Sequence, residues 1–320
     1  MNSDERYALK LNIAKLYYEQ KLTQAEITER LNVSRPTLIK LMKEAQEEGI
    51  VRIEICDIRK MTEYRVIENQ LKQVLGLKDA KIVGANSDNM DKMSQAIGEK
   101  STEFILKYFE SGMKVGVGWG RTLEVLAASM ESVKDVWDVS FSTILGGPGS
   151  AEDYTMFSNL LCERIASRFT GSSVNYLYAP LFVDSPVVRD AYVSLPNVKS
   201  ALGRFDELDL ALVGIDGDAE HSTTFSVEPG MERMFSPEEY KRIVGNVCSR
   251  FYDADGNMVS GEVEQGIIGI SAKQLRNIST VIGLAGGTYK VDSIIGGAKA
   301  GLFNVLVTDV FTAKKILERH

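Results

Sequence analysis

From about residue 80 onward, the chain alternates short apolar segments with amphipathic helices. The apolar segments are AKIVG, MKVGVGWG, SFSTILGG, SVNYLYAP, LDLALVGI, VIGLAGG and LFNVLVTD. Each has the length and composition of a buried strand, and the order is typical of a mainly parallel sheet with helices packed on it. The sequence therefore predicts an α/β domain over residues 80–320.

The first 55 residues follow a different pattern, in which apolar side chains recur every three or four positions. They form three groups, and each group predicts a short helix. The groups are Leu9, Ile13, Leu16 and Tyr17; Ala25, Ile27 and Leu31; and Leu38, Leu41, Met42 and Ala45. Residues 50–55, IVRIEI, then alternate apolar and charged side chains like a half-buried strand. This order predicts a winged helix-turn-helix over residues 1–56.

Capping residues separate these helices. Thr23 stands three residues before Glu26, as in a capping box, and Ser34 precedes a helix that carries Pro36 in its first turn. Residues 57–79 again show helical spacing and predict a linker helix between the two domains.

Charge is distributed unevenly along the chain. The formal net charge of −7 belongs to residues 56–320, because residues 1–55 hold nine basic and nine acidic side chains. Residues 34–43, SRPTLIKLMK, contain three basic residues and no acidic one. A helix of this kind can enter the major groove, where short polar or guanidinium side chains meet base edges and lysines meet phosphates. The alternative is a helical module that binds another protein.

These features predict operator DNA as a partner. The candidate DNA-binding residues are Thr23, Gln24, Ser34, Arg35, Thr37, Lys40 and Lys43.

Other classes of protein are disfavoured. No apolar run approaches the ~18 residues of a membrane span, and the start of the chain lacks a secretion signal. Cys56, Cys162 and Cys248 lie far apart and are predicted to be small, reduced core residues. We expect a cytoplasmic protein with no membrane contact, no metal site and no cofactor.

Glycines follow several of the predicted strands, where parallel sheets bind anions. The segment VGVGWGRTL, residues 115–123, offers Gly116, Gly118 and Gly120 for close backbone approach, with Arg121 and Thr122 as donors. It is neither a Walker loop nor a complete GxGxxG motif, and a structural turn is the alternative.

Three further predicted strands are also followed by loops that contain glycine. Gly286 and Gly287 are followed by Lys290, which is either an anion ligand or a solvated lysine. The loops at Gly146–Gly147 and at Asp216 can complete the pocket rim or serve only as turns.

Nearly the whole chain resembles the SorC family of bacterial sugar-responsive transcriptional regulators. The similar segments are VGVGWGRTL, LYAP, DLALVGI, RIVGNVCSRFYDADG and VIGLAGGTYKVDSIIGGAKAGLFNVLVTDVFTAKKIL. The resemblance implies a C-terminal domain related in fold to ribose-5-phosphate isomerase and glucosamine-6-phosphate deaminase. It also implies a sugar or sugar-phosphate effector, and dimers or tetramers on operator DNA.

The same resemblance implies roles for particular residues. Gly118, Trp119, Gly120, Arg121, Thr122 and Lys290 would face the effector phosphate, while Asp216 and Asn246 would line the sugar end. From their places after predicted strands, Gly146, Gly147 and Gly287 are also expected to bind the effector. The chain departs from the family pattern at two positions. The chain has Gly245-Asn246 where the family commonly has Gly-Asp, and it has Gly214-Ile215-Asp216 where Gly-Ile-Gly is usual.

A catalytic alternative arises because Asp216, Asp218 and His221 are similar to the deaminase segment Gly-Ile-Gly-x-Asp-Gly-His in another register. Isomerisation or deamination needs a general acid and base beside the sugar. His221 and His320 are the two histidines of the chain, and an isomerase has no use for residues 1–55. We therefore predict a regulator, a repressor of a carbohydrate operon, whose DNA-binding state changes when the sugar binds.

Overall fold

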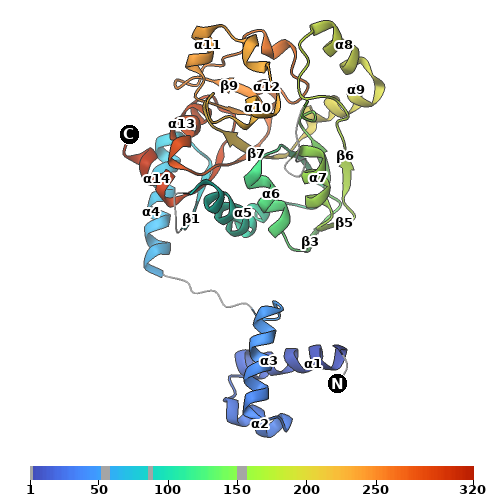
Figure 1. The fold of residues 1–320 in the computed structure, drawn as a ribbon, viewed down its shortest axis with the longest axis vertical. Helices are drawn as coiled ribbons and strands as arrows, with labels where there is room; N and C mark the ends of the chain where they lie inside the picture. Colours follow the sequence, from blue (N-terminus) through green and yellow to red (C-terminus); the bar gives the residue numbers. More distant parts are fainter. Residues whose placement is uncertain (1–2, 52–57, 86–88, 150–156) are drawn as a thin grey trace. The chain divides into compact units, whose positions relative to one another are not determined.

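The computed structural model describes residues 3–51, 58–85, 89–149 and 157–320. Its contacts divide the chain into two compact units, Met1–Met61 and Thr62–His320, and each is described by itself (Figure 1).

Three helices form the first unit: α1 (Ser3–Ala14), which continues as the π-helical turn η1 (Lys15–Glu19), α2 (Gln24–Leu31) and α3 (Arg35–Glu47). Their apolar stripes meet in a small core of Ile13, Leu16, Ile27, Leu38 and Leu41. The predicted capping box is present, since the Thr23 N–H donates to Glu26 Oε2 at 2.7 Å and the Glu26 N–H donates to Thr23 Oγ1 at 3.3 Å. The wing predicted at 50–55 falls mostly on residues outside the described ranges.

Two ion pairs join α1 to the C-terminal half of α3. The Arg6 guanidinium donates to both carboxylate oxygens of Glu44, at 2.6 and 3.1 Å, and the buried Lys10 ammonium pairs with Glu48. Both acidic residues are thereby neutralised within the unit. The acid-free segment, residues 34–43, forms the N-cap and the earlier part of α3, where Arg35 and Lys40 are exposed.

The helix α4 (Ile58–Leu75) occupies most of the predicted linker. The boundary between the two units falls inside it, and its later turns bury Ile67 and Leu71 in the core of the second unit. From Thr62 onward this helix is therefore part of the second unit.

Within the described residues, nine strands of the second unit form one sheet. Seven of them run parallel in the order β1, β11, β10, β7, β2, β4, β6. Their bounds are Asp79–Val83 (β1), Val305–Asp309 (β11), Thr280–Leu284 (β10), Leu210–Asp216 (β7), Lys114–Val117 (β2), Ser140–Thr143 (β4) and Ser173–Asn175 (β6). The antiparallel hairpin β8 (Gly245–Val247) and β9 (Arg250–Tyr252) extends from the end of β7. A separate pair is formed by β3 (Val133–Trp137) and β5 (Phe169–Thr170).

Helices cover both faces of the sheet, as the alternating pattern predicted (Figure 1). Along β7, Leu210 and Leu212 enter one core, while Ala211, Val213 and Ile215 enter the other. The first core is completed by α5 (Met90–Leu106), α6 (Arg121–Ser129) and α7 (Ser158–Ala166), and the second by α4, α9 (Pro196–Gly203), α12 (Ala272–Asn277), α13 (Val291–Lys299) and α14 (Val310–Leu317). The remaining α-helices are α8 (Pro186–Ser194), α10 (Thr223–Val227) and α11 (Pro237–Arg242).

The order of the strands places a crevice beside β7. From β2 the chain proceeds to β4 on one side, whereas from β7 it proceeds to β10 and β11 on the other. The helices α6 and α13 that follow β2 and β10 pack on opposite faces of the sheet. Ligands of open parallel sheets bind at such a reversal, outside the carboxyl ends of the strands.

Candidate functional site

A pocket with a volume of about 150 Å³ opens at this reversal. It is lined by segments far apart in sequence: the loop from β2 into α6, the end of β7 with the start of α10, the β8–β9 hairpin, and the turn η5 (Thr288–Lys290) before α13. The lining residues are Ser94, Trp119, Gly120, Arg121, Thr122, Leu145, Gly214, Ile215, Asp216, His221, Thr223, Thr224, Asn246, Cys248, Leu284, Tyr289 and Lys290.

The N-terminus of α6 forms one end of the pocket. Gly120 precedes the helix with a φ of 134°, a conformation that favours glycine, and no side chain caps the first turn. Thr122 is buried within that turn. Arg121 is more exposed, and its Nη1 lies 3.4 Å from Asp91 Oδ1. Uncapped N–H groups and the helix dipole together attract an anion.

Lys290 lies on another wall of the same pocket. Its Nζ donates to the carbonyl oxygen of Ile215 at 2.7 Å and lies 5.7 Å from the centre of the Tyr289 ring. Burial lowers the pKa of this ammonium, and the nearby Asp216 carboxylate partly counteracts that effect. A bound anion would favour the charged form in the same way.

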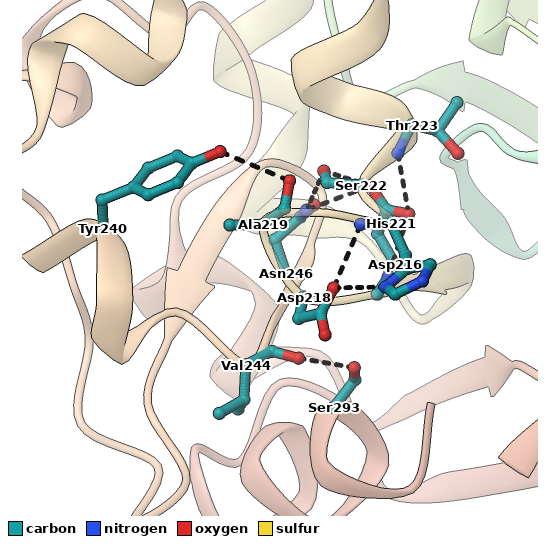
Figure 2. Close-up of polar contacts among 11 residues, drawn as sticks. Asp216, Asp218, Ala219, His221, Ser222, Thr223, Tyr240, Val244, Asn246 and Ser293 are labelled. Atoms are coloured by element: carbon teal, nitrogen blue, oxygen red, sulfur yellow. Dashed lines mark hydrogen bonds and ion pairs between the residues drawn. The ribbon is translucent and has the colours of Figure 1, made fainter. Parts of the chain in front are cut away.

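Asp216 anchors the loop that leads into α10. Its Oδ1 accepts from Gly217 N (3.0 Å) and Thr223 N (3.1 Å), and its Oδ2 accepts from Ser222 Oγ (2.8 Å), Thr224 N (3.1 Å), Thr224 Oγ1 (3.2 Å) and Asn246 Nδ2 (3.2 Å). Figure 2 shows Asp216 beside Ser222 and Thr223. The carboxylate has about four lone-pair directions and is saturated by its own chain. It shapes the pocket and has little capacity left for an effector hydroxyl.

Asn246 is the buried partner of Asp216 on β8. Its Nδ2 donates to Asp216 and, at 3.4 Å, to Ser222 Oγ, while its Oδ1 accepts from Ser249 N and shares the single Thr224 hydroxyl proton with Asp216 Oδ2. The two departures from the family pattern are therefore in contact. An aspartate in place of Asn246 would set a second carboxylate against Asp216, whereas the amide supplies a donor.

Seven of the predicted effector residues line the pocket, namely Trp119, Gly120, Arg121, Thr122, Asp216, Asn246 and Lys290. The other four, Gly118, Gly146, Gly147 and Gly287, are not part of its lining. Their N–H groups donate within the chain, to Leu212 O, to Ile268 O, to Ala179 O, and to Asp309 Oδ2 and Thr312 Oγ1, respectively. A Cβ on Gly146 would lie 2.3 Å from Pro180 O, so this glycine permits close packing of the backbone.

Several lining residues were not predicted from the sequence. Tyr289 adjoins Lys290, and burial raises the pKa of its phenol to about 12. Ser94 lies on α5 and carries no local signal, because only the fold brings that helix to the pocket. Cys248, predicted to be a core residue, is buried but also reaches the pocket, and burial raises the pKa of its thiol to about 12. Cys162 is buried, and Cys56 lies outside the described residues.

His221 lines the pocket and Asp218 supports it, with 2.7 Å between His221 Nδ1 and Asp218 Oδ1. The catalytic alternative also needs a carboxylate that is free to act as a base beside the sugar. Asp216 does not meet that need, because both of its oxygens accept hydrogen bonds from the chain.

The candidate DNA-binding residues lie on α3 and at the start of α2. Ser34 caps α3 by accepting from Thr37 N at 3.3 Å, and the two hydroxyls lie 2.8 Å apart. Arg35 and Lys40 are exposed, and Lys43 is exposed beside Glu47, at 3.4 Å. Thr23 and Gln24 begin α2, where Thr23 is engaged in the capping box.

The residues that the structure describes contain no helix long and apolar enough to cross a bilayer. They also contain no group of three or more His, Cys, Asp or Glu side chains arranged to hold a metal ion.

Comparison with known proteins identifies both units. Residues 59–318 match the family model described as "Putative sugar-binding domain", and residues 16–52 match "Winged helix-turn-helix DNA-binding". The chain is 30% identical over 318 residues to the sorbitol operon regulator of Klebsiella pneumoniae, covering 99% of each chain. It is 28% identical over 317 residues to the deoxyribonucleoside regulator of Bacillus subtilis (strain 168), covering 98% of each.

A solved structure supports the same assignment. The full-length sorbitol operon regulator SorC from Klebsiella pneumoniae superposes with a TM-score of 0.83 at 30% identity, covering 99% of this chain and 100% of that one. These relatives are regulators rather than enzymes, which confirms the predicted regulator over the catalytic alternative. Since both domains match in the predicted order and nearly the whole chain aligns, this chain belongs to the SorC family of sugar-responsive DNA-binding transcriptional regulators.

Proposed function

We propose that the pocket binds a phosphorylated sugar or polyol, with the phosphate at the N-terminus of α6. The uncapped first turn of that helix carries the proposal, because Gly120, Arg121 and Thr122 all line the pocket there. Lys290 adds a partly buried cation on another wall. Together these groups offer backbone donors, a hydroxyl and two positive charges to one anion.

The sugar portion then lies toward the wall formed by the end of β7 and the start of α10. Thr223, Thr224 and Asn246 line the pocket there, with Leu145 and Leu284 as apolar neighbours. Relatives named for sorbitol and for deoxyribonucleosides make hexitol phosphates and pentose phosphates the first probes.

For the first unit, we propose that α3 reads operator DNA from the major groove. Exposed Arg35 and the residues around it face bases, while Lys40 and Lys43 hold phosphates. The protein acts in the cytoplasm as a homodimer or homotetramer, and effector binding lowers its affinity for the operator of a carbohydrate operon. Ligand and DNA then each favour a different state of one equilibrium.

A thermal-shift screen tests the pocket. The probes are inorganic phosphate and matched free and phosphorylated pentoses, hexoses and hexitols. A ligand at 100 times its dissociation constant should stabilise the sensor unit by ~2.7 kcal/mol. We expect stabilisation by one group of phosphorylated probes, and titration of that ligand should release operator DNA in a fluorescence-anisotropy assay. If the whole panel changes neither the melting temperature nor the operator affinity, the proposal is wrong.

A further inference from the structure

A tight turn after β7 holds a histidine at the pocket. The His221 N–H donates to the Asp218 carbonyl oxygen at 3.1 Å and to Asp218 Oδ1 at 3.0 Å, while the His221 ring places Nδ1 2.7 Å from the same carboxylate oxygen. His221 lines the pocket and Asp218 does not. Figure 2 shows the ring extending away from Asp218.

The carboxylate determines which ring nitrogen carries the proton. An ionised carboxylate accepts hydrogen bonds and cannot donate, so Nδ1 of His221 must be the donor. In the neutral ring Nε2 then has a free lone pair. This nitrogen lies on the edge of the ring opposite the one that contacts Asp218 and can accept from a ligand hydroxyl.

The carboxylate and amide oxygens on this wall are already engaged. Both oxygens of Asp216 and the Oδ1 of Asn246 accept hydrogen bonds from their own chain. The Lys290 ammonium and the N-terminus of α6 are donors, which suit a phosphate. A sugar hydroxyl is both donor and acceptor, so an acceptor is the complementary group that this wall needs.

The position of the ring suits a hydroxyl of the sugar portion. The His221 ring lies 5.5 Å from the Tyr289 ring, and Lys290 Nζ lies 5.7 Å from the centre of that same Tyr289 ring. His221 and Lys290 therefore both adjoin Tyr289, and all three residues line the same pocket. A ligand whose phosphate reaches Lys290 can thus bring its hydroxyl-bearing carbons close to His221.

We propose that His221 determines the sugar specificity of this pocket, by accepting a hydrogen bond from an effector hydroxyl at Nε2, and that Asp218 is the positioning residue that sets its tautomer. The inference rests on the proposed function, since it assigns the hydroxyl-reading role within the same site. The ligand class is a sugar or polyol phosphate with a free hydroxyl on its carbon chain.

The test uses two substitutions of His221 in the full-length protein. H221F keeps a ring beside Tyr289 but removes both nitrogens, whereas H221Q carries an amide oxygen at about the reach of Nε2. We expect H221F to weaken binding of the tightest sugar phosphate in the panel about tenfold, and H221Q to restore most of that affinity. Dissociation constants are measured by calorimetry, with inorganic phosphate as the probe for the anion end alone.

Asp218 is tested against a matched neighbour. D218N permits the other tautomer and should weaken sugar-phosphate binding several-fold with little effect on inorganic phosphate. E220Q removes an exposed carboxylate from the same turn and should change neither constant. Melting temperatures of all four variants distinguish loss of contact from loss of folding.

Each other outcome has a defined meaning. Equal affinity of H221F and wild type for the sugar phosphate overturns the inference, and so does a failure of H221Q to exceed H221F. A parallel loss of inorganic phosphate and sugar phosphate in H221F also overturns it, because His221 would then bind the anion. If wild-type protein binds neither probe, the proposed function itself fails.

Discussion

Asn246 Nδ2 donates to Asp216 Oδ2 across 3.2 Å, and this contact joins the two positions at which the chain departs from its family. The resemblance to the family implies an acidic residue after the glycine of β8. Here the carboxylate stands at the end of β7 and an amide stands on β8, so this contacting pair contains one carboxylate.

Substituting Asn246 by aspartate should therefore destabilise the protein. The introduced carboxylate would face Asp216 without the donor that the amide supplied, and two carboxylates this close cannot both ionise at neutral pH. We expect N246D to lower the melting temperature by about 5 °C at pH 7.5, with a smaller loss at pH 5. The double variant N246D/D216G should recover part of the loss, and a double variant no more stable than N246D would contradict the pairing.

Lys290 is predicted to supply affinity for the anion. K290Q removes the charge while keeping a hydrogen-bond donor near Ile215, and it should weaken sugar-phosphate binding by about 10- to 100-fold. The control is K299Q, which neutralises an exposed lysine at the C-terminal end of α13, the helix that follows Lys290. Calorimetry measures the dissociation constant of the sugar phosphate for both variants. An equal loss of affinity in K290Q and K299Q would show a general effect of charge and would contradict a specific role for Lys290.

Substitutions on α3 should change how the DNA-binding constant depends on salt concentration and on DNA sequence. K40A removes one phosphate contact and should reduce the slope of log K against log[salt] by about one, uniformly across sequences. R35A should instead reduce the preference for operator over random DNA. Lys15 is exposed on η1, outside α3, and K15A is the matched control that should leave both quantities unchanged.

Glu228 should make stability depend on pH. This buried carboxyl accepts from the Gly149 N–H at 2.6 Å, yet burial outweighs that bond and raises its pKa to about 7. Because the folded-state pKa exceeds the ordinary value, the folded state holds the proton more tightly, and stability falls as pH rises from about 4.5 to about 7.

The comparison of E228Q with wild type tests this. Glutamine keeps an acceptor for Gly149 without a charge, so E228Q should melt about 2–4 °C above wild type at pH 8 and close to it at pH 5. Melting curves across that range measure the difference. If the melting temperatures of E228Q and wild type differ by the same amount at every pH, the difference arises from packing and not from ionisation of Glu228.

The turn between β8 and β9 is predicted to store strain. Cys248 and Ser249 have φ of 53° and 56°, and the buried Ser249 hydroxyl has no hydrogen-bond partner among the described residues. Glycine suits this conformation in two-residue hairpins, so S249G should raise the melting temperature by about 2 °C. S249A removes the hydroxyl but retains the positive φ, and it should gain less than S249G if backbone strain contributes.

Local patterns predicted the parts of this molecule that depend on neighbours in sequence. The buried strand within LDLALVGI and the capping box at Thr23 both appear in the structure because a few adjacent residues decide them. The sequence also predicted the proposed anion end of the pocket, since Gly120, Arg121 and Thr122 lie together in the chain and all line the pocket.

The proposed sugar end was harder to predict because it is assembled from distant segments. Nothing local to Asp216 shows that six donors will occupy its oxygens, and nothing near Ser94 shows that α5 reaches the pocket. Glycines such as Gly146 and Gly287 look like ligand-binding turns in sequence. The structure instead uses their amides for internal hydrogen bonds.

The saturated carboxylate of Asp216 has a consequence for how such a sensor can diversify. Its six hydrogen bonds set the shape of the wall before any ligand arrives, so the scaffold does not depend on which molecule is recognised. Exposed positions such as His221 can then be exchanged at little cost to folding. Duplicated copies of this domain can acquire new effectors by changing a few such side chains on an inherited frame.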